Sequence, residues 1–281
     1  EQVDGLLDAK SEEKFVTLQD AIIEGAVRMR SSILPGLLDA VRLNLNHQRR
    51  DLKLFEIGKV FAAKESEDGL PNEREFLTLV LTGSEVQEAK SMAIRELDFF
   101  DLKGAVEAAF DAAHITGIYF GAIEVKHLRK GQAASISIGE TRIGAIGRLN
   151  DDIAASYKFR QPVYVGEIDL QAALSRTTTL PVYQPLAKYP GISRDVSFVA
   201  KRNITYASIN DAIRSQQAEL LRAVEFVDVY EGKGLADDER SITVRLEYLS
   251  PERTLVEDEV EALHEQLVTS AEQNLGIKRR F

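Results

Sequence analysis

A proline-rich break near residue 180 divides this sequence into two parts. Residues 175–181 are polar, rich in threonine and closed by Pro181, and three of the seven prolines fall between Pro181 and Pro190. Because proline fixes its own backbone and favours extended structure before it, this stretch is typical of an extended linker. The 281 residues suit about two domains. We expect one domain over 1–180 and another over 181–281.

Composition narrows the classes of protein that fit this chain. Hydrophobic residues at 44% and charged residues at 28% match soluble globular proteins rather than disordered ones. The 45 acidic and 35 basic side chains give a net charge of −10, which excludes a nucleic-acid footprint over the whole chain. A local basic patch stays open, because screening confines each charge to about 10 Å. There is no cysteine, so disulfides, thiolate zinc sites and cysteine nucleophiles are excluded.

The sequence shows neither a membrane span nor a secretory signal. No apolar run approaches the ~18 residues that a span needs, and the acidic start at Glu1 lacks the apolar core of a signal peptide. We expect a cytoplasmic protein that does not bind membranes. The missing initial methionine suggests a piece of a longer chain.

The first part mixes helical and strand patterns and predicts an α+β fold. Apolar residues at helical spacing, including Leu34, Leu38 and Val41, predict a helix over 33–46, and a second helix is expected over 98–113. Strands are expected at 15–18, 52–61, 76–81, 135–138, 143–146 and 163–168. Because the strands lie close together with helices between them, we expect an antiparallel sheet backed by helices.

The second part has the order β-α-β-β-α-β of a ferredoxin-like domain. Strands are expected at 196–200, 221–230, 242–249 and 277–281, and helices at 206–217 and from Thr254 to Gly276. Thr254 and Glu257 have the spacing of a capping box for the second helix. Because both helices of this fold cover one sheet face, the other face is available to a partner.

No motif in the sequence identifies a reaction. Phosphate-binding and dinucleotide-binding glycine loops and a nucleophile elbow are missing, and the acidic run at 257–259 is explained by the dipole of the helix it begins. The four histidines are too far apart to form a metal-ligand pair, and we expect His114, His127 and His264 to be exposed. We assign no catalytic residue and no metal ligand.

The uncovered sheet face of the second domain is the best candidate for a binding site. Alternation along the strands predicts outward positions for Asp195, Ser197, Val199, Phe226, Asp228 and Tyr230, and core positions for Val227 and Val229. Two aromatic rings beside an acid can stack bases and accept hydrogen bonds from a base edge. An interface or a partly covered second core explains the same pattern equally well.

Basic residues near this face strengthen the hypothesis of RNA binding. The chain ends in Lys278, Arg279, Arg280 and Phe281, although a basic end is often only solvated. The candidate phosphate contacts are Arg194, Lys201, Arg202, Lys278 and Arg280.

Several ordered motifs resemble one family over essentially the whole chain. Residues 183–190, 193–195 and 226–234, continued by Ser241 and 253–255, resemble the ferredoxin-fold anticodon-binding domain of the bacterial phenylalanyl-tRNA synthetase β-subunit family. Residues 29–38 and 54–61 are similar to the class II synthetase-like module of the same family.

The resemblance implies a function in aminoacylation. Enzymes of this family attach phenylalanine to tRNA-Phe, using ATP and Mg²⁺, as tetramers of two α and two β subunits. The α subunit carries the active site, so the resemblance implies a scaffold for α and no cofactor bound by this chain. Consistently, residues 163–169 contain one glycine and lack the glycine-rich strand and arginine of a class II ATP site.

The resemblance also implies roles for four residues of the last domain. Tyr230 would stack on the first anticodon base, a guanine, and Asp228 would accept hydrogen bonds from its Watson–Crick edge. Ser241 would add a hydroxyl contact, and Arg279 would lie near the phosphates or bases.

The sequence departs from a full subunit, and two other functions stay open. The editing domain and the N-terminal tRNA-binding-like domain have no counterpart here, so hydrolysis of mischarged tRNA is not assigned.

One alternative function is a regulatory module that binds a small molecule, which would need a closed pocket rather than an exposed face. A pure assembly protein without RNA contact is the other alternative. The charge of −10 predicts weak, salt-dependent binding to RNA.

Overall fold

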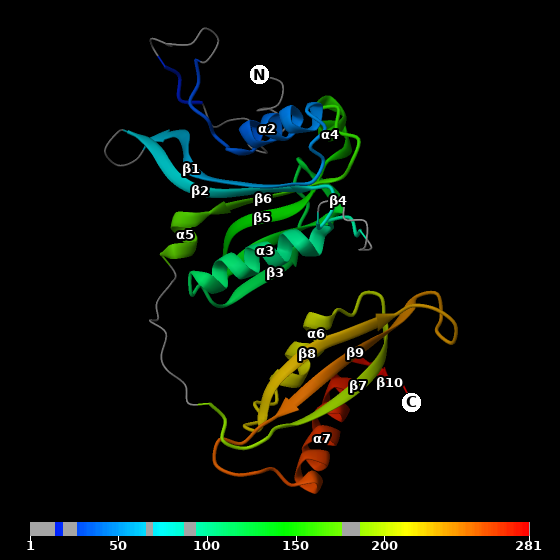
Figure 1. Cartoon of the computed structure of the whole chain (residues 1–281). Helices are drawn as coiled ribbons and strands as arrows, with labels where there is room; N and C mark the ends of the chain where they lie inside the picture. Colours follow the sequence, from blue (N-terminus) through cyan, green and yellow to red (C-terminus); the bar gives the residue numbers. More distant parts are fainter. Residues whose placement is uncertain (1–14, 19–26, 66–69, 87–93, 176–185, 281) are drawn as a thin grey trace. The chain divides into compact units, whose positions relative to one another are not determined.

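The computed structural model divides the chain into two compact units, 1–182 and 183–281. It describes residues 15–18, 27–65, 70–86, 94–175 and 186–280 (Figure 1). The expected extended linker falls largely outside the described residues, since 176–185 are not among them. Each unit has its own hydrophobic core.

Unit 1 is built on a six-stranded antiparallel sheet with the strand order β1-β2-β6-β5-β4-β3. Its strands are β1 (Leu52–Glu65), β2 (Pro71–Thr82), β3 (Ile118–Ala122), β4 (Leu128–Ile138), β5 (Thr141–Leu149) and β6 (Val163–Asp169). Its helices are α2 (Leu34–Asn46), α3 (Phe99–Ala112), α4 (Asp151–Ser156) and α5 (Leu170–Leu174). The predicted α+β class with an antiparallel sheet is confirmed.

Helices cover both faces of this sheet and enclose two apolar cores (Figure 1). On one face, α2 and α4 pack their apolar residues, such as Leu38 and Ile153, against Val80 and Val165. On the other face, α3 and α5 pack Leu102 and Ala173 with neighbouring strand residues. The apolar spacing of α2 therefore buries one face of the helix, as the sequence predicts.

Local signals set the starts of these helices. Pro35 lies in the first turn of α2, where its missing N–H costs no hydrogen bond. Asp98 caps α3 and forms a reciprocal capping box with Asp101, which also accepts two hydrogen bonds from Arg95. These bonds lower the pKa of Asp101 to about 2.

Unit 2 has the ferredoxin-like order that its sequence predicts. Its four-stranded antiparallel sheet has the order β10-β7-β9-β8. Its elements are β7 (Ile192–Lys201), α6 (Tyr206–Arg214), β8 (Leu221–Tyr230), β9 (Glu239–Tyr248), α7 (Glu257–Leu275) and β10 (Lys278–Arg279). The helices α6 and α7 pack on one face, around a core that includes Phe198, Val244 and Val268 (Figure 1). We call the other face of this sheet the open face.

Some expected elements differ from the observed ones. The expected strand at 15–18 is an isolated bridge between Thr17 and Arg28. The helix α7 begins at Glu257 rather than being capped by Thr254, because Arg253 holds Glu259, whose carboxylate accepts the Val256 N–H at 2.7 Å. The sequence pattern does not predict β3, α4 or α5. Among the described helices, none combines the length and apolar character needed to span a bilayer.

Candidate nucleic-acid interface

The register of unit 2 arranges the open face in rows across the strands. Directly paired residues of antiparallel strands share a sheet face. One row contains Tyr230, Ser241, Val199 and Lys278, and the adjacent row contains Asp228, Thr243 and Ser197. The expected outward positions of Asp228 and Tyr230 are therefore confirmed, as are those of Asp195, Ser197 and Val199.

The ring of Tyr230 is 40% exposed and held in place at two points. Its hydroxyl donates to the Lys233 carbonyl at 3.3 Å, in the β8–β9 loop. The Arg280 guanidinium carbon lies 4.7 Å from the ring centroid, a cation–π contact. Gly232 leaves room for this arrangement, because a Cβ there would lie 2.8 Å from the Tyr230 hydroxyl. These contacts fix the orientation of the Tyr230 ring, and the planar guanidinium of Arg280 lies over it.

Asp228 shares its row with two hydroxyl groups, those of Thr243 and Ser197. Its Oδ1 accepts the N–H of Val229 at 2.8 Å, which orients the carboxylate. Thr243 lies directly opposite Asp228 and shares a 2.8 Å hydrogen bond with the Ser197 hydroxyl. The carboxylate and the hydroxyl pair together present acceptors and a donor to a base edge.

Ser241 lies directly opposite Tyr230 but is only 2% exposed. It is therefore covered, whereas the family resemblance implies a hydroxyl available to a base. A contact with RNA at Ser241 requires the side chains above it to move.

A β-bulge in β8 overturns the predicted position of Phe226. The register shifts between Phe226 and Asp228, so Phe226 pairs with the core residue Val244 while Asp228 stays on the open face. Phe226 makes an edge contact with Tyr206 of α6, with 5.7 Å between ring centroids. The predicted inward orientation of Val229 is confirmed, because it pairs with the core residue Ile242, but Val227 and Val229 are both 42% exposed on an outer strand and neither belongs to the core.

Two arginines expected to contact RNA, Arg194 from its charge and Arg279 from the family resemblance, face the helices instead. Arg279 pairs with the core residue Phe198 across the sheet, and its guanidinium bonds to Glu265 at 2.7 Å and Glu272 at 3.3 Å. Arg194 forms ion pairs with Glu257 and Glu261 of α7. These arginines tie the sheet to α7, and neither lies on the open face.

The other candidate phosphate contacts surround the Tyr230 end of the sheet. Lys278 shares the row of Tyr230. The backbone N–H of Arg280 donates to the Ser197 carbonyl at 2.7 Å, which holds the chain end beside this row. Lys201 and Arg202 follow at the end of β7, where they form ion pairs with Asp238 at 3.9 Å and Glu231 at 3.0 Å. All four side chains are exposed.

Negative charge gathers in the rows beyond Asp228. Arg245 donates two hydrogen bonds to Asp195, at 2.7 and 2.8 Å, and lowers the pKa of that carboxyl. Glu225 lies directly opposite Arg245 on the neighbouring strand. Glu247 lies on the same face, one row further from Tyr230. The acids of these rows make this end of the open face unfavourable for an anion.

Two histidines expected to be exposed are buried, whereas His114 is exposed as expected. His264 accepts or donates a 2.9 Å hydrogen bond at Nδ1 with the hydroxyl of Tyr248 in the core of unit 2. His127 lies 3.7 Å from the Glu167 carboxylate in unit 1. In the part of the chain that the structure describes, no three His, Asp or Glu side chains group to hold a metal ion.

Sequence reasoning missed two contributors to the open face, Arg280 as the partner of Tyr230 and Thr243 as the neighbour of Asp228. Alternation carried the signal in both cases. The apolar Ile277 is buried, which places Lys278 and Arg280 on the open side and Arg279 on the helix side. Likewise, the buried Ile242 and Val244 leave Thr243 between them on the open face.

Comparison with known proteins identifies similar sequences for both units. A family model described as "Phenylalanyl tRNA synthetase beta chain CLM domain" matches residues 1–170. A second, "Ferredoxin-fold anticodon binding domain", matches residues 187–280.

Curated relatives are phenylalanine–tRNA ligase beta subunits. A phenylalanine–tRNA ligase beta subunit of Listeria innocua is 33% identical over 95% of this chain and 33% of the relative. The subunit of Bacillus subtilis is 34% identical over 87% of this chain and 30% of the relative. The chain thus spans about a third of the length of the curated relatives it matches.

Proposed function

The chain belongs to the phenylalanyl-tRNA synthetase β-chain family, and from this premise we propose that it recognises the anticodon of tRNA-Phe during aminoacylation. It would act as the C-terminal part of a phenylalanine–tRNA ligase β subunit. The observation that carries the proposal is the arrangement of Tyr230 and Asp228 in adjacent rows of one uncovered sheet face. A ring for stacking and a carboxylate for a base edge are the two elements that single-stranded RNA recognition needs.

In this proposal, each residue of the open face has a role. Tyr230 stacks on the first anticodon base, a guanine, and Asp228 accepts hydrogen bonds from its N1–H and 2-amino group. Arg280 takes the role that the resemblance implies for Arg279, because the Arg280 guanidinium lies over the Tyr230 ring. Lys278, Lys201 and Arg202 attract the phosphates. Ser241 contributes once the side chains above it move.

We further propose that the chemistry takes place on a partner α subunit, which this chain helps to scaffold within an α2β2 tetramer. ATP and Mg²⁺ would then bind to α. In support, the single glycine of β6, Gly166, packs tightly against the core, where a Cβ would lie 2.9 Å from Ile146. It offers no open cradle to a nucleotide. A surface for α is suggested by Phe55 and Ile57, which are exposed on the outer strand β1.

Fluorescence anisotropy with an anticodon stem-loop of tRNA-Phe tests the anticodon role. The chain should prefer guanosine over adenosine at the first anticodon position. Tyr230→Ala should weaken binding to the guanosine loop about tenfold, because a stacked base contributes roughly 1–3 kcal/mol.

Tyr119→Ala is the matched control, since Tyr119 is an exposed tyrosine on β3 of unit 1 and should have no effect. Equal binding of both loops, unchanged by Tyr230→Ala, would reject base recognition and leave assembly with α as the main function.

A further inference from the structure

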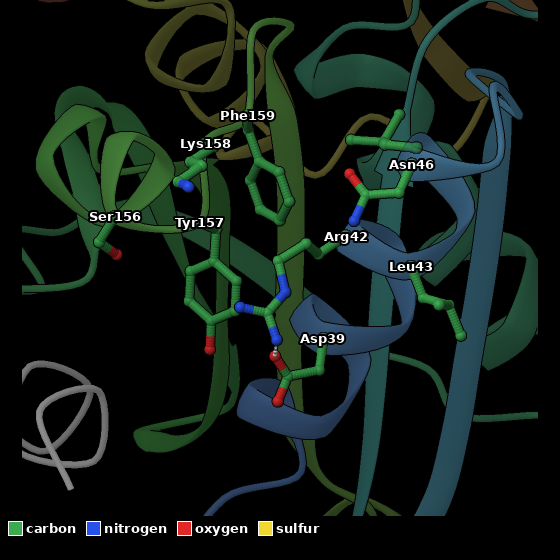
Figure 2. A pocket seen from close by; sticks show the side chains of 9 residues that line it. Asp39, Arg42, Leu43, Asn46, Ser156, Tyr157, Lys158 and Phe159 are labelled. Atoms are coloured by element: carbon green, nitrogen blue, oxygen red, sulfur yellow. Dashed lines mark ion pairs between the residues drawn. The ribbon is translucent and has the colours of Figure 1, made fainter.

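Unit 1 contains a groove that no part of the proposed function uses. It has a volume of about 420 Å³ and lies between the C-terminal half of α2 and the segment after α4 (Figure 2). Its lining residues are Asp39, Arg42, Leu43, Leu45, Asn46 and 156–159.

The interior of the groove is held by contacts between these two segments. Arg42 forms an ion pair with Asp39 at 2.8 Å, and its guanidinium lies 5.8 Å from the centre of the Tyr157 ring (Figure 2). Tyr157 in turn stacks on Phe159, with 5.3 Å between ring centroids. The interior is therefore ordered, and its one lining carboxylate is already neutralised.

Four exposed cations lie on the segments that form the groove or directly beside those segments in the chain. They are Arg49, Arg50, Lys158 and Arg160. The two segments that carry them are adjacent, because the Gln161 side chain donates to the Arg50 carbonyl at 2.7 Å. We call the groove with these four residues and Arg42 the basic groove.

Few acids oppose the basic groove. Among the ion pairs of the described residues, none involves Arg49, Arg50, Lys158 or Arg160. The nearby Asp51 uses its Oδ1 to accept the Ser84 N–H at 2.7 Å. Two cations that line the groove and three that flank it in the chain therefore stand out in a protein whose net charge is −10.

We propose that the basic groove binds the phosphate backbone of folded RNA, as a contact separate from the open face of unit 2. Charge complementarity favours this occupant, because guanidinium groups match phosphate geometry and an RNA backbone supplies negative charge at regular spacing. A neutral small molecule would make no use of these four exposed cations. The proposal rests on the proposed function only for the source of the RNA, a tRNA.

The salt dependence of RNA binding tests the basic groove. The whole chain is titrated into a tRNA-Phe transcript, and into an acceptor-stem hairpin that has no anticodon, over a series of KCl concentrations. Arg49→Gln combined with Arg160→Gln should lower the slope of log K against log [KCl] by about 2, since each phosphate contact contributes roughly 0.9. The effect should be the same for both RNAs.

Lys130→Gln combined with Arg142→Gln is the matched control. It also removes two exposed cations from unit 1, on β4 and β5, and should leave the slope unchanged. Circular dichroism confirms that both variants fold.

Slopes that do not differ between the two double variants would overturn the proposal. So would an unchanged slope accompanied by lost association with the α subunit, which would assign the groove to an acidic protein surface. Because the hairpin lacks an anticodon, this result is independent of guanosine preference and of Tyr230→Ala.

Discussion

Two adjacent arginines near the C-terminus lie on opposite faces of one sheet, which gives them different roles. Arg280 lies over the Tyr230 ring on the open face. Arg279 faces α7, where the hydrogen bonds that it donates to the carboxylates of Glu265 and Glu272 raise the pKa of its guanidinium. The two positions thus form a natural pair for separating RNA binding from stability.

Substituting each arginine by alanine tests this separation. Arg280→Ala should weaken binding of the anticodon stem-loop about fivefold, because it removes a cation beside the base site. Arg279→Ala should keep the affinity within about twofold but lower the free energy of unfolding by about 1 kcal/mol, since two partly exposed ion pairs are lost. Anisotropy and urea unfolding followed by circular dichroism measure the two quantities. Equal losses of affinity in both variants would contradict the assignment.

At the residue scale, the sequence could predict part of the candidate site. Alternation placed Asp228 and Tyr230 on one face, as the structure confirms. It failed at Phe226, because a bulge inserts one extra residue and no pattern in an outer strand marks where that happens. Ser241 is on the open face but buried, because side chains of other residues cover it. Alternation along one strand predicts the face of a residue but not whether neighbouring side chains cover it.

At the element scale, one buried hydrogen bond links β9 to α7. The Tyr248 hydroxyl lies 2.9 Å from Nδ1 of His264, which is 7% exposed. Burial lowers the pKa of His264 below its ordinary value of 6.5 and raises that of Tyr248. The folded state therefore holds a neutral imidazole beside a protonated hydroxyl.

This link predicts an acid-sensitive unit 2. Below about pH 6.5 the unfolded chain binds a proton at His264 that the folded chain does not, so stability is complete above that pH and falls as the pH drops. Urea unfolding at several pH values measures this effect. The free energy of unfolding should fall less steeply with decreasing pH in His264→Gln than in the wild type, because glutamine does not titrate. His114→Gln, at an exposed histidine, is the control and should retain the wild-type slope. Identical slopes for wild type and His264→Gln would exclude this role.

Elements with a clear period could be predicted, and short ones could not. The helices α2 and α3 and the ferredoxin-like order of unit 2 follow from apolar spacing over many residues. By contrast, α4 spans six residues and buries only Ile153, which is too little for a helical period. The five-residue β3 is an outer strand with a weak burial pattern. Its place in the sheet depends on pairing with β4.

At the scale of the whole molecule, charge is unevenly distributed. The chain carries a net charge of −10, yet its basic groove and the Tyr230 end of the open face each present several cations. Local attraction can coexist with overall repulsion, because salt screens charges beyond about 10 Å. We therefore expect RNA binding by this chain to be weak and strongly dependent on salt.

The most direct test of the account is a thermodynamic cycle between Asp228 and the first anticodon base. Stem-loops with guanosine or inosine at that position differ by the 2-amino group that Asp228 is proposed to bind. Wild type should bind the inosine loop more weakly by about 1 kcal/mol or more. This penalty should vanish in Asp228→Ala and persist in Glu225→Ala, which removes another exposed acid from β8. The same inosine penalty in wild type and Asp228→Ala would contradict recognition of the anticodon by this face.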